Sequence, residues 1–172
     1  PHKLAEFVEG TKSRLIHIST DCVFSGEKGN YTETDFSDAK DLYGKTKFLG
    51  ELTNYHNSIT LRTSIIGPEL KGKVSLLEWF LAQMGNVNGY TNAIYSGFPT
   101  TELINIIENY IIPNPSLSGL YNVASDPISK YELLKIIAKV YNKEIVIRPF
   151  NDFKTNKTLN CNKFKKDFKF KN

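Results

Sequence analysis

The chain has 172 residues, of which 40% are hydrophobic and 23% charged, a composition typical of globular proteins. No apolar stretch reaches the roughly 18 residues of a membrane-spanning helix, and no secretory signal is visible, so a membrane partner is not expected. The net charge of +4 comes mainly from lysine rather than arginine, which argues against nucleic-acid recognition. Two cysteines, Cys22 and Cys161, form no disulfide or metal-binding pattern, and this usage favours the reducing cytoplasm.

Hydrophobic periodicity predicts alternating strands and helices along the chain. Strands are predicted over residues 13–18, 58–66, 90–96, 119–124 and 144–148, and helices over residues 3–8, 42–55, 74–84, 100–112 and 129–141. Residues 25–40 are expected to form a loop, because glycine, asparagine and acidic residues gather there. Residues 151–172 are rich in Lys and Asn, and their Phe side chains are expected to pack on the core from a helix or arm. This alternation indicates an α/β fold with a parallel sheet.

Two short segments carry the clearest chemical pattern. An apolar run ends in the hydroxyls of Ser19 and Thr20, and a predicted helix then carries Tyr43 and Lys47, four residues apart. Residues at this spacing share one face of a helix, so the ammonium can stabilise the phenolate of the tyrosine. A tyrosine assisted in this way can act as a general acid, and a hydroxyl at the end of the strand can hold the oxygen of a carbonyl substrate. The pattern therefore indicates a carbonyl reductase.

The same spacing occurs a second time, in Tyr131 and Lys135. No strand ending in hydroxyls precedes this pair, so it is interpreted as an ordinary surface pair. The three histidines are isolated in the sequence, and no metal site is predicted.

Several longer motifs are more specific than the spacing alone. They are Ser19–Gly26 (STDCVFSG), Tyr31–Glu33 (YTE), Tyr43–Glu51 (YGKTKFLGE), Leu61–Ser64 (LRTS), Pro99–Leu103 (PTTEL) and Gly119–Val123 (GLYNV). With these motifs the chain resembles the dTDP-4-dehydrorhamnose reductase family, which belongs to the extended short-chain dehydrogenases/reductases. The resemblance runs through nearly the whole chain and weakens after Arg148.

The resemblance implies roles for individual residues. The catalytic residues would be Thr20, Tyr43 and Lys47. Cofactor-binding residues would be Ser19, Tyr43, Lys47, Thr63 and Ile65, and substrate-binding residues would be Thr20, Asp21, Arg62 and Ile65. A structural hydrogen-bond role for Arg62 is an open alternative. Two positions depart from the family, because Cys22 replaces a usual Tyr and Ile65 replaces a Trp that rhamnose-forming members tend to have.

The resemblance also implies the architecture, a partial Rossmann-like parallel sheet with a smaller substrate-binding lobe. Residues 1–69 would be the C-terminal part of the dinucleotide-binding domain. Residues 70–172 would form mainly the substrate-binding lobe, with Rossmann elements interleaved at about 99–124. The glycine-rich turn that binds pyrophosphate in such domains is absent from the sequence. We therefore interpret the chain as the C-terminal portion of a longer protein.

The function implied by the resemblance is the reduction of a nucleotide-linked 4-keto-6-deoxy sugar, with NADPH or NADH as the cofactor. The partner would be a nucleotide sugar, and a homodimer is a possible assembly. A nucleotide-sugar epimerase or dehydratase of the same superfamily is an alternative. A second alternative is a non-catalytic, nucleotide-binding regulatory subunit, against which the intact set of Thr20, Tyr43 and Lys47 argues.

Overall fold

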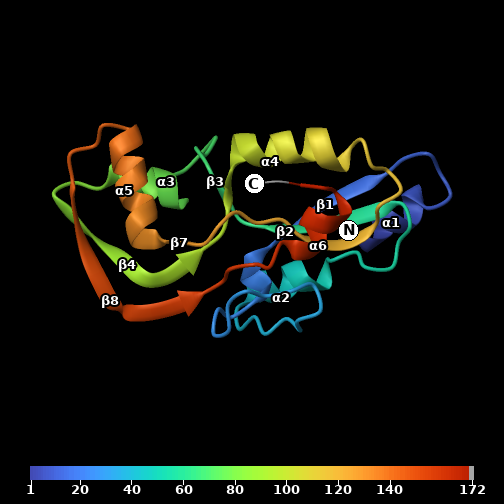
Figure 1. Ribbon diagram of the computed structural model, residues 1–172, viewed down its shortest axis with the longest axis horizontal. Helices are drawn as coiled ribbons and strands as arrows, with labels where there is room; N and C mark the ends of the chain where they lie inside the picture. The colour runs from blue at the N-terminus through green and yellow to red at the C-terminus, as the bar shows by residue number, and fades with distance from the viewer. Residues whose placement is uncertain (171–172) are drawn as a thin grey trace.

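The computed structural model describes residues 1–170 as an α/β protein with two lobes (Figure 1). The strands are β1 (Leu15–Thr20), β2 (Ser58–Thr63), β3 (Ile65–Ile66), β4 (Asn86–Tyr95), β5 (Phe98–Pro99), β6 (Gly119–Asn122), β7 (Ile128–Ser129) and β8 (Val146–Asn156). The helices are α1 (His2–Val8), α2 (Leu42–Leu49), α3 (Leu76–Ala82), α4 (Thr100–Ile106), α5 (Lys130–Val140) and α6 (Asn162–Asp167). A 3₁₀ turn, η1 (Asp21–Val23), follows β1, and a π-helical turn, η2 (Ile107–Ile111), extends α4.

The larger sheet is parallel throughout and has the strand order β1-β2-β6. Thr20 of β1 lies opposite Thr63 of β2, so these two strands end together at the carboxyl end of the sheet. All six residues of β2 are buried, as expected for the central strand of a covered parallel sheet. Within the described residues β1 pairs only with β2, which leaves its other edge unpaired. The predicted α/β class and parallel sheet are confirmed.

The smaller sheet has the order β7-β4-β8, in which β4 runs parallel to β8 and antiparallel to β7. Figure 1 shows α3 and α5 on one face of this sheet, at the left of the molecule. The contact is close at Gly89, because a Cβ there would lie 2.6 Å from the Tyr131 ring of α5. The two-stranded pair β3-β5 connects this lobe with the larger sheet.

Each lobe has its own hydrophobic core. The core of the larger sheet includes Phe24, Ile59, Leu61 and Ile106, all completely buried. The core of the smaller lobe is built from buried side chains of α3, β4 and α5, namely Leu77, Phe80, Val87, Leu134 and Ile137. None of the helices in residues 1–170 combines the length and apolar character that crossing a bilayer requires.

The C-terminal segment partly differs from the prediction. The last strand was expected to end at Arg148 but continues to Asn156, because Pro149 sits on an edge strand and the backbone of β4 pairs with the chain beyond it. Phe164, Phe168 and Phe170 are buried in the core of the larger sheet, which confirms the expected packing of these rings. Phe153 is an exception, since half of its surface is exposed. Residues 171 and 172 of the predicted arm lie outside the described residues.

The strand predicted over residues 90–96 begins earlier, at Asn86. Two other predicted boundaries were wrong for identifiable reasons. The helix predicted over residues 42–55 ends at Leu49, because the chain turns inward at Gly50 and buries Glu51 and Leu52. The backbone N–H of Leu52 then donates to the Thr60 hydroxyl at 2.9 Å, a contact with β2 that competes with helix continuation. The strand predicted over residues 58–66 is divided at Ser64, after which β3 joins β5 instead of the larger sheet.

Candidate active site

Thr20 occupies the last position of β1, where the parallel strands end and the chain turns into η1. It is buried, with 8% of its surface exposed. Its Oγ1 accepts a hydrogen bond from the Cys22 backbone N–H at 3.1 Å and donates to Asp21 Oδ1 at 3.2 Å. These contacts fix the hydroxyl at the carboxyl end of the sheet, where parallel α/β folds place their ligands.

The helix α2 brings Tyr43 and Lys47 to the same region. Asp41 caps it, accepting a hydrogen bond from the Gly44 N–H at 2.8 Å. Gly44 packs directly on η1, since a Cβ at this position would lie 2.2 Å from the Cys22 carbonyl oxygen. Only glycine permits this approach, which places the residue before it, Tyr43, beside the turn that follows Thr20. More than half of the Tyr43 surface is exposed, so its side chain is not part of the core.

Lys47 is half-buried and reaches back to β1. Its Nζ donates a hydrogen bond to the Ile18 carbonyl oxygen at 2.7 Å. An ammonium has three donors, so this contact fixes the position of Lys47 and leaves other donors for a ligand. The structure thus brings Thr20, Tyr43 and Lys47 onto two elements in contact.

Ser19 and Arg62 lie in a separate, buried network. Arg62 donates from Nε to Glu51 Oε1 at 2.7 Å and from Nη2 to Oε2 at 2.6 Å, and Ser19 Oγ donates to Oε1 at 2.7 Å. The Arg62 guanidinium also lies 5.0 Å from the centre of the Phe24 ring. Arg62 is 1% exposed and makes structural hydrogen bonds of the kind that the sequence left as an alternative, and its buried Nη1 has no partner among the described residues. The structure does not bring its side chain, or that of Ser19, to the surface of the site.

Asp21 is a buried carboxylate next to Thr20. Burial raises its pKa above the ordinary value, against the opposing positive charges of Lys157 and Lys130. Burial also raises the pKa of the neighbouring Cys22 thiol, and the negative charge of Asp21 adds to this effect. The site therefore has a desolvated acidic group whose charged form is favoured by two lysines, Lys157 and Lys130.

The remaining predicted residues, Thr63 and Ile65, follow one another along the end of β2 and the start of β3. Thr63 is buried, and its Oγ1 has no hydrogen-bond partner among the described residues. Ile65 is 46% exposed and lines a cavity of about 90 Å³ with Ser64, Tyr95 and Lys130.

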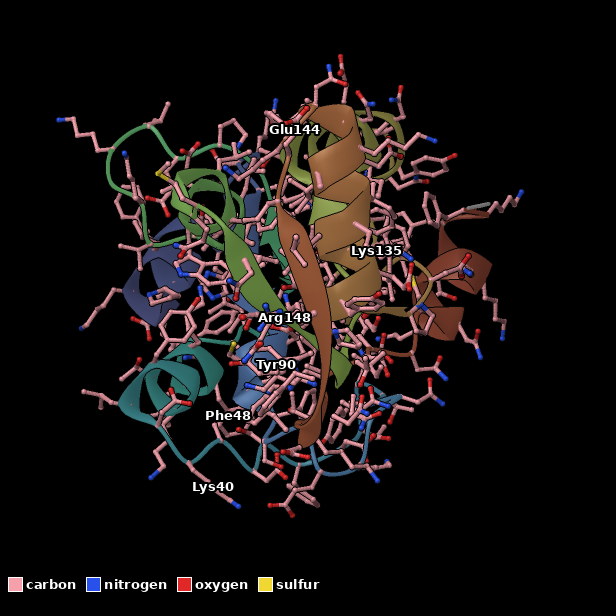
Figure 2. All side chains as sticks on the ribbon, turned by 90° about the vertical axis from the view of Figure 1, so that its left-hand side faces the viewer. Lys40, Phe48, Tyr90, Lys135, Glu144 and Arg148 are labelled. Atoms are coloured by element: carbon pink, nitrogen blue, oxygen red, sulfur yellow. The ribbon has the colours of Figure 1, made fainter. Side chains whose placement is uncertain are left out.

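The second Tyr–Lys pair lies elsewhere. Lys135 pairs with Glu132 on the surface of α5, and its Nζ lies 5.2 Å from the centre of the Tyr131 ring. In Figure 2, Lys135 on α5 is well separated from Phe48, the residue after Lys47 on α2. The interpretation of Tyr131 and Lys135 as a surface pair is consistent with this position.

Sequence reasoning missed four residues that shape the site. Glu51 was assigned to a helix, although its position next to the helix-ending Gly50 was a usable signal. Gly44 was quoted in the motif without a role, and its close approach to Cys22 becomes visible only in three dimensions. Tyr95 and Lys130 come from distant parts of the chain, and no local pattern links them to Asp21.

Residues 1–160 match the family described as RmlD substrate binding domain. A dTDP-4-dehydrorhamnose reductase from Aggregatibacter actinomycetemcomitans is 34% identical over 139 residues, which are 75% of this chain and 47% of that protein. A methionine adenosyltransferase 2 subunit beta from Xenopus laevis is 28% identical over 95% of this chain and 55% of that protein. The chain thus spans about half the length of the curated relatives that it matches.

Solved structures share the fold. A hypothetical dTDP-4-dehydrorhamnose reductase from Sulfolobus tokodaii matches 96% of this chain and 63% of that chain with a TM-score of 0.76 and 24% identity. A dTDP-4-dehydrorhamnose reductase from Bacillus anthracis, in complex with NADP, matches 87% of this chain and 54% of that chain with a TM-score of 0.71 and 22% identity. Together with the match over residues 1–160, these findings show that the chain belongs to the RmlD substrate binding domain family, related to the dTDP-4-dehydrorhamnose reductases.

Proposed function

We propose that the protein reduces a nucleotide-linked 4-keto-6-deoxy sugar with NADPH or NADH, as part of the synthesis of dTDP-rhamnose or a related deoxysugar for cell-surface polysaccharide. The observation that carries the proposal is the contact between α2 and η1, which sets Tyr43 beside the turn after Thr20. The hydrogen bond from Lys47 to Ile18 adds support, because it anchors the third residue of the set to the same strand. Membership of the family favours this chemistry over unrelated carbonyl reductions.

The residues present fit the nicotinamide and ribose end of such a cofactor. Thr63 offers a buried hydroxyl without a partner among the described residues, and Ile65 offers an exposed apolar surface beside it. Lys47 would hold the ribose with the donors that its contact to Ile18 leaves free. When bound, the cofactor supplies hydride to the carbonyl carbon.

The chain's own residues would supply the proton and the orientation. The Thr20 hydroxyl would hold the carbonyl oxygen of the sugar at the end of β1. Tyr43 would donate its hydroxyl proton to that oxygen as general acid, and the Lys47 ammonium would stabilise the phenolate that remains. Asp21 would contact the substrate next to Thr20.

The arrangement in two lobes supports separate roles for cofactor binding and substrate binding. We place the C-terminal part of the dinucleotide-binding domain in residues 1–69. Residues 70–172 would form mainly the substrate-binding lobe, with Rossmann elements at about 99–124. The buried Phe164 adds one feature to this division, because α6 returns to the core of the larger sheet. A cytoplasmic location and a homodimer belong to the same proposal.

The direct test is a steady-state assay of the full-length protein with dTDP-4-dehydrorhamnose and NADPH. Consumption of NADPH that depends on the sugar nucleotide, with a reduced sugar as product, is the expected result. A protein that binds both ligands without consuming NADPH would contradict the proposal. Conversion of the sugar nucleotide without net use of NADPH would instead point to an epimerase or dehydratase.

A non-catalytic regulatory subunit is the second candidate. The observation that favours it is the similarity to methionine adenosyltransferase 2 subunits beta from several vertebrates, including one from Rattus norvegicus with 30% identity over 80% of this chain. In that case the protein would bind a nucleotide and a partner enzyme without turnover. A change in the activity of a methionine adenosyltransferase on addition of the protein, together with no reductase activity, would favour this candidate.

A further inference from the structure

The small cavity beside Ile65 has polar walls that the proposed mechanism leaves unused. Its volume is about 90 Å³, room for about three water molecules or one polar substituent of a ligand. Tyr95 at the end of β4 and Lys130 at the start of α5 both line it. Ser64, between the predicted site residues Thr63 and Ile65, also lines it.

Tyr95 presents a buried hydroxyl to this region. Only 6% of the residue is exposed, and its hydroxyl lies against Gly97 and close to Ser64 without a well-aligned hydrogen bond among the described residues. Burial raises the pKa of Tyr95 to about 12, so the group stays a neutral donor at physiological pH. A buried hydroxyl without a partner is costly, which makes it a marker for a missing ligand or water.

Lys130 adds a cation with no ion-pair partner. Its Nζ lies 3.9 Å from the centre of the Tyr95 ring, and it takes part in none of the ion pairs found within residues 1–170. Burial lowers the pKa of this lysine, and the nearby negative charge of Asp21 opposes that effect. The negative charge of Asp21 also raises the pKa of Tyr95. The cavity is therefore within electrostatic reach of the carboxylate that adjoins Thr20.

We propose that Lys130 and Tyr95 are specificity-determining residues that donate hydrogen bonds to an oxygen substituent of the sugar, remote from the carbonyl that is reduced. The inference rests on the proposed function and goes beyond it by assigning a subsite for the sugar. An ammonium over the Tyr95 ring and the hydroxyl of that ring suit a sugar hydroxyl, whose oxygen accepts two hydrogen bonds. Ile65, Ile66 and Leu77 supply the aliphatic part of the lining, and Ser64 and Ser75 supply further hydroxyls.

The test measures binding of dTDP and of dTDP-L-rhamnose to the full-length protein by calorimetry. Lys130→Met removes the charge and retains the chain length, Lys130→Arg retains the charge, and Lys135→Met is the matched control on the same helix. We expect Lys130→Met to weaken binding of dTDP-L-rhamnose roughly 10- to 100-fold, the range for one hydrogen bond from a charged donor, with dTDP binding unchanged. Lys130→Arg should recover part of the affinity, and Lys135→Met should match the wild type.

Tyr95→Phe provides a second variant that removes one oxygen atom. It should weaken binding of dTDP-L-rhamnose several-fold while the melting temperature stays at or above that of the wild type, because the buried hydroxyl has no well-aligned hydrogen bond to lose. The inference is overturned if both variants bind dTDP-L-rhamnose as the wild type does, or if they lose affinity for dTDP to the same extent. A wild-type protein that binds neither ligand would refute the proposed function itself, and with it this inference.

Discussion

At the scale of single residues, the buried pair of Glu51 and Arg62 should dominate the stability of the larger sheet. Glu51→Ala leaves a guanidinium that is 1% exposed without its carboxylate. Breaking a buried pair on one side typically costs about 3–5 kcal/mol. Urea unfolding should therefore show a loss in that range. The control is Glu27→Ala, which removes an exposed partner of Lys40 and should cost less than about 1 kcal/mol. Equal losses for the two variants would contradict the structural role of Arg62.

Two aspartates should respond to pH with opposite signs. Burial raises the pKa of Asp21 from 3.8, so its native state binds the proton more tightly than the unfolded chain does. The free energy of unfolding of the wild type therefore falls, relative to that of Asp21→Asn, as the pH rises above 3.8 through the raised pKa. Hydrogen bonds from Lys28 and Thr32 lower the pKa of Asp35 to about 2, so its contribution is present above 3.8 and lost as the pH falls through about 2.

Chemical denaturation between pH 3 and pH 7 checks both signs. The free energy of unfolding of Asp21→Asn should gain on the wild type as the pH rises, whereas Asp35→Asn should fall behind it. The opposite result would be a free energy of unfolding for Asp21→Asn that falls relative to the wild type as the pH rises. It would mean that Lys157 and Lys130 stabilise the Asp21 carboxylate of the wild type more strongly than burial destabilises it.

Whether a contact could be predicted from the sequence depends on how far apart in the chain its residues lie. The shared helix face of Tyr43 and Lys47 could be anticipated, because a four-residue helical spacing is local. The partner of Arg62 could not, since Glu51 had first to leave the predicted helix at Gly50. Tyr95 and Lys130 meet only through the packing of α5 on β4, which no spacing in the sequence encodes.

At the scale of elements, α6 should stabilise the larger sheet through its phenylalanines. Phe164 is completely buried and lies against Phe168 with 4.6 Å between ring centres. Phe164→Ala should cost about 3–5 kcal/mol, as is usual for removing a buried aromatic ring. Phe153→Ala, on β8 and half exposed, should cost less than about 1 kcal/mol. Guanidinium unfolding compares the two, and a small effect at Phe164 would argue against the docking of α6 on the core.

The order of elements was largely predictable, and their ends were less so. The helix predicted over residues 129–141 is found as α5, and it begins at an N-cap in which the Ser129 hydroxyl accepts the Glu132 N–H at 3.1 Å. The extension of β8 through Pro149 was not predictable, because the pairing with β4 joins residues about 60 positions apart in the chain. Tertiary pairing decided this boundary over local propensity.

At the scale of the whole molecule, we expect these 172 residues alone to bind NADPH poorly. Within the described residues, β1 pairs on one side only, and the sequence contains no glycine-rich turn to hold a pyrophosphate. The chain also spans about half of the curated relatives. Calorimetry should detect no saturable binding at micromolar NADPH, although thermal unfolding shows a folded protein. A micromolar dissociation constant would show that the residues present suffice for the cofactor.

The central claim is that Tyr43 is the proton donor of a hydride-transfer reaction. The most direct measurement follows deuterium from NADPH labelled at the nicotinamide C4 into dTDP-4-dehydrorhamnose, in the full-length wild type and in Tyr43→Phe, with Tyr131→Phe as the control. The account predicts deuterium at C4 of the sugar, a rate about 10²- to 10⁴-fold lower in Tyr43→Phe with little change in cofactor affinity, and a normal rate in the control. Unchanged transfer in Tyr43→Phe, or no transfer by a wild-type protein that binds both ligands, would contradict it.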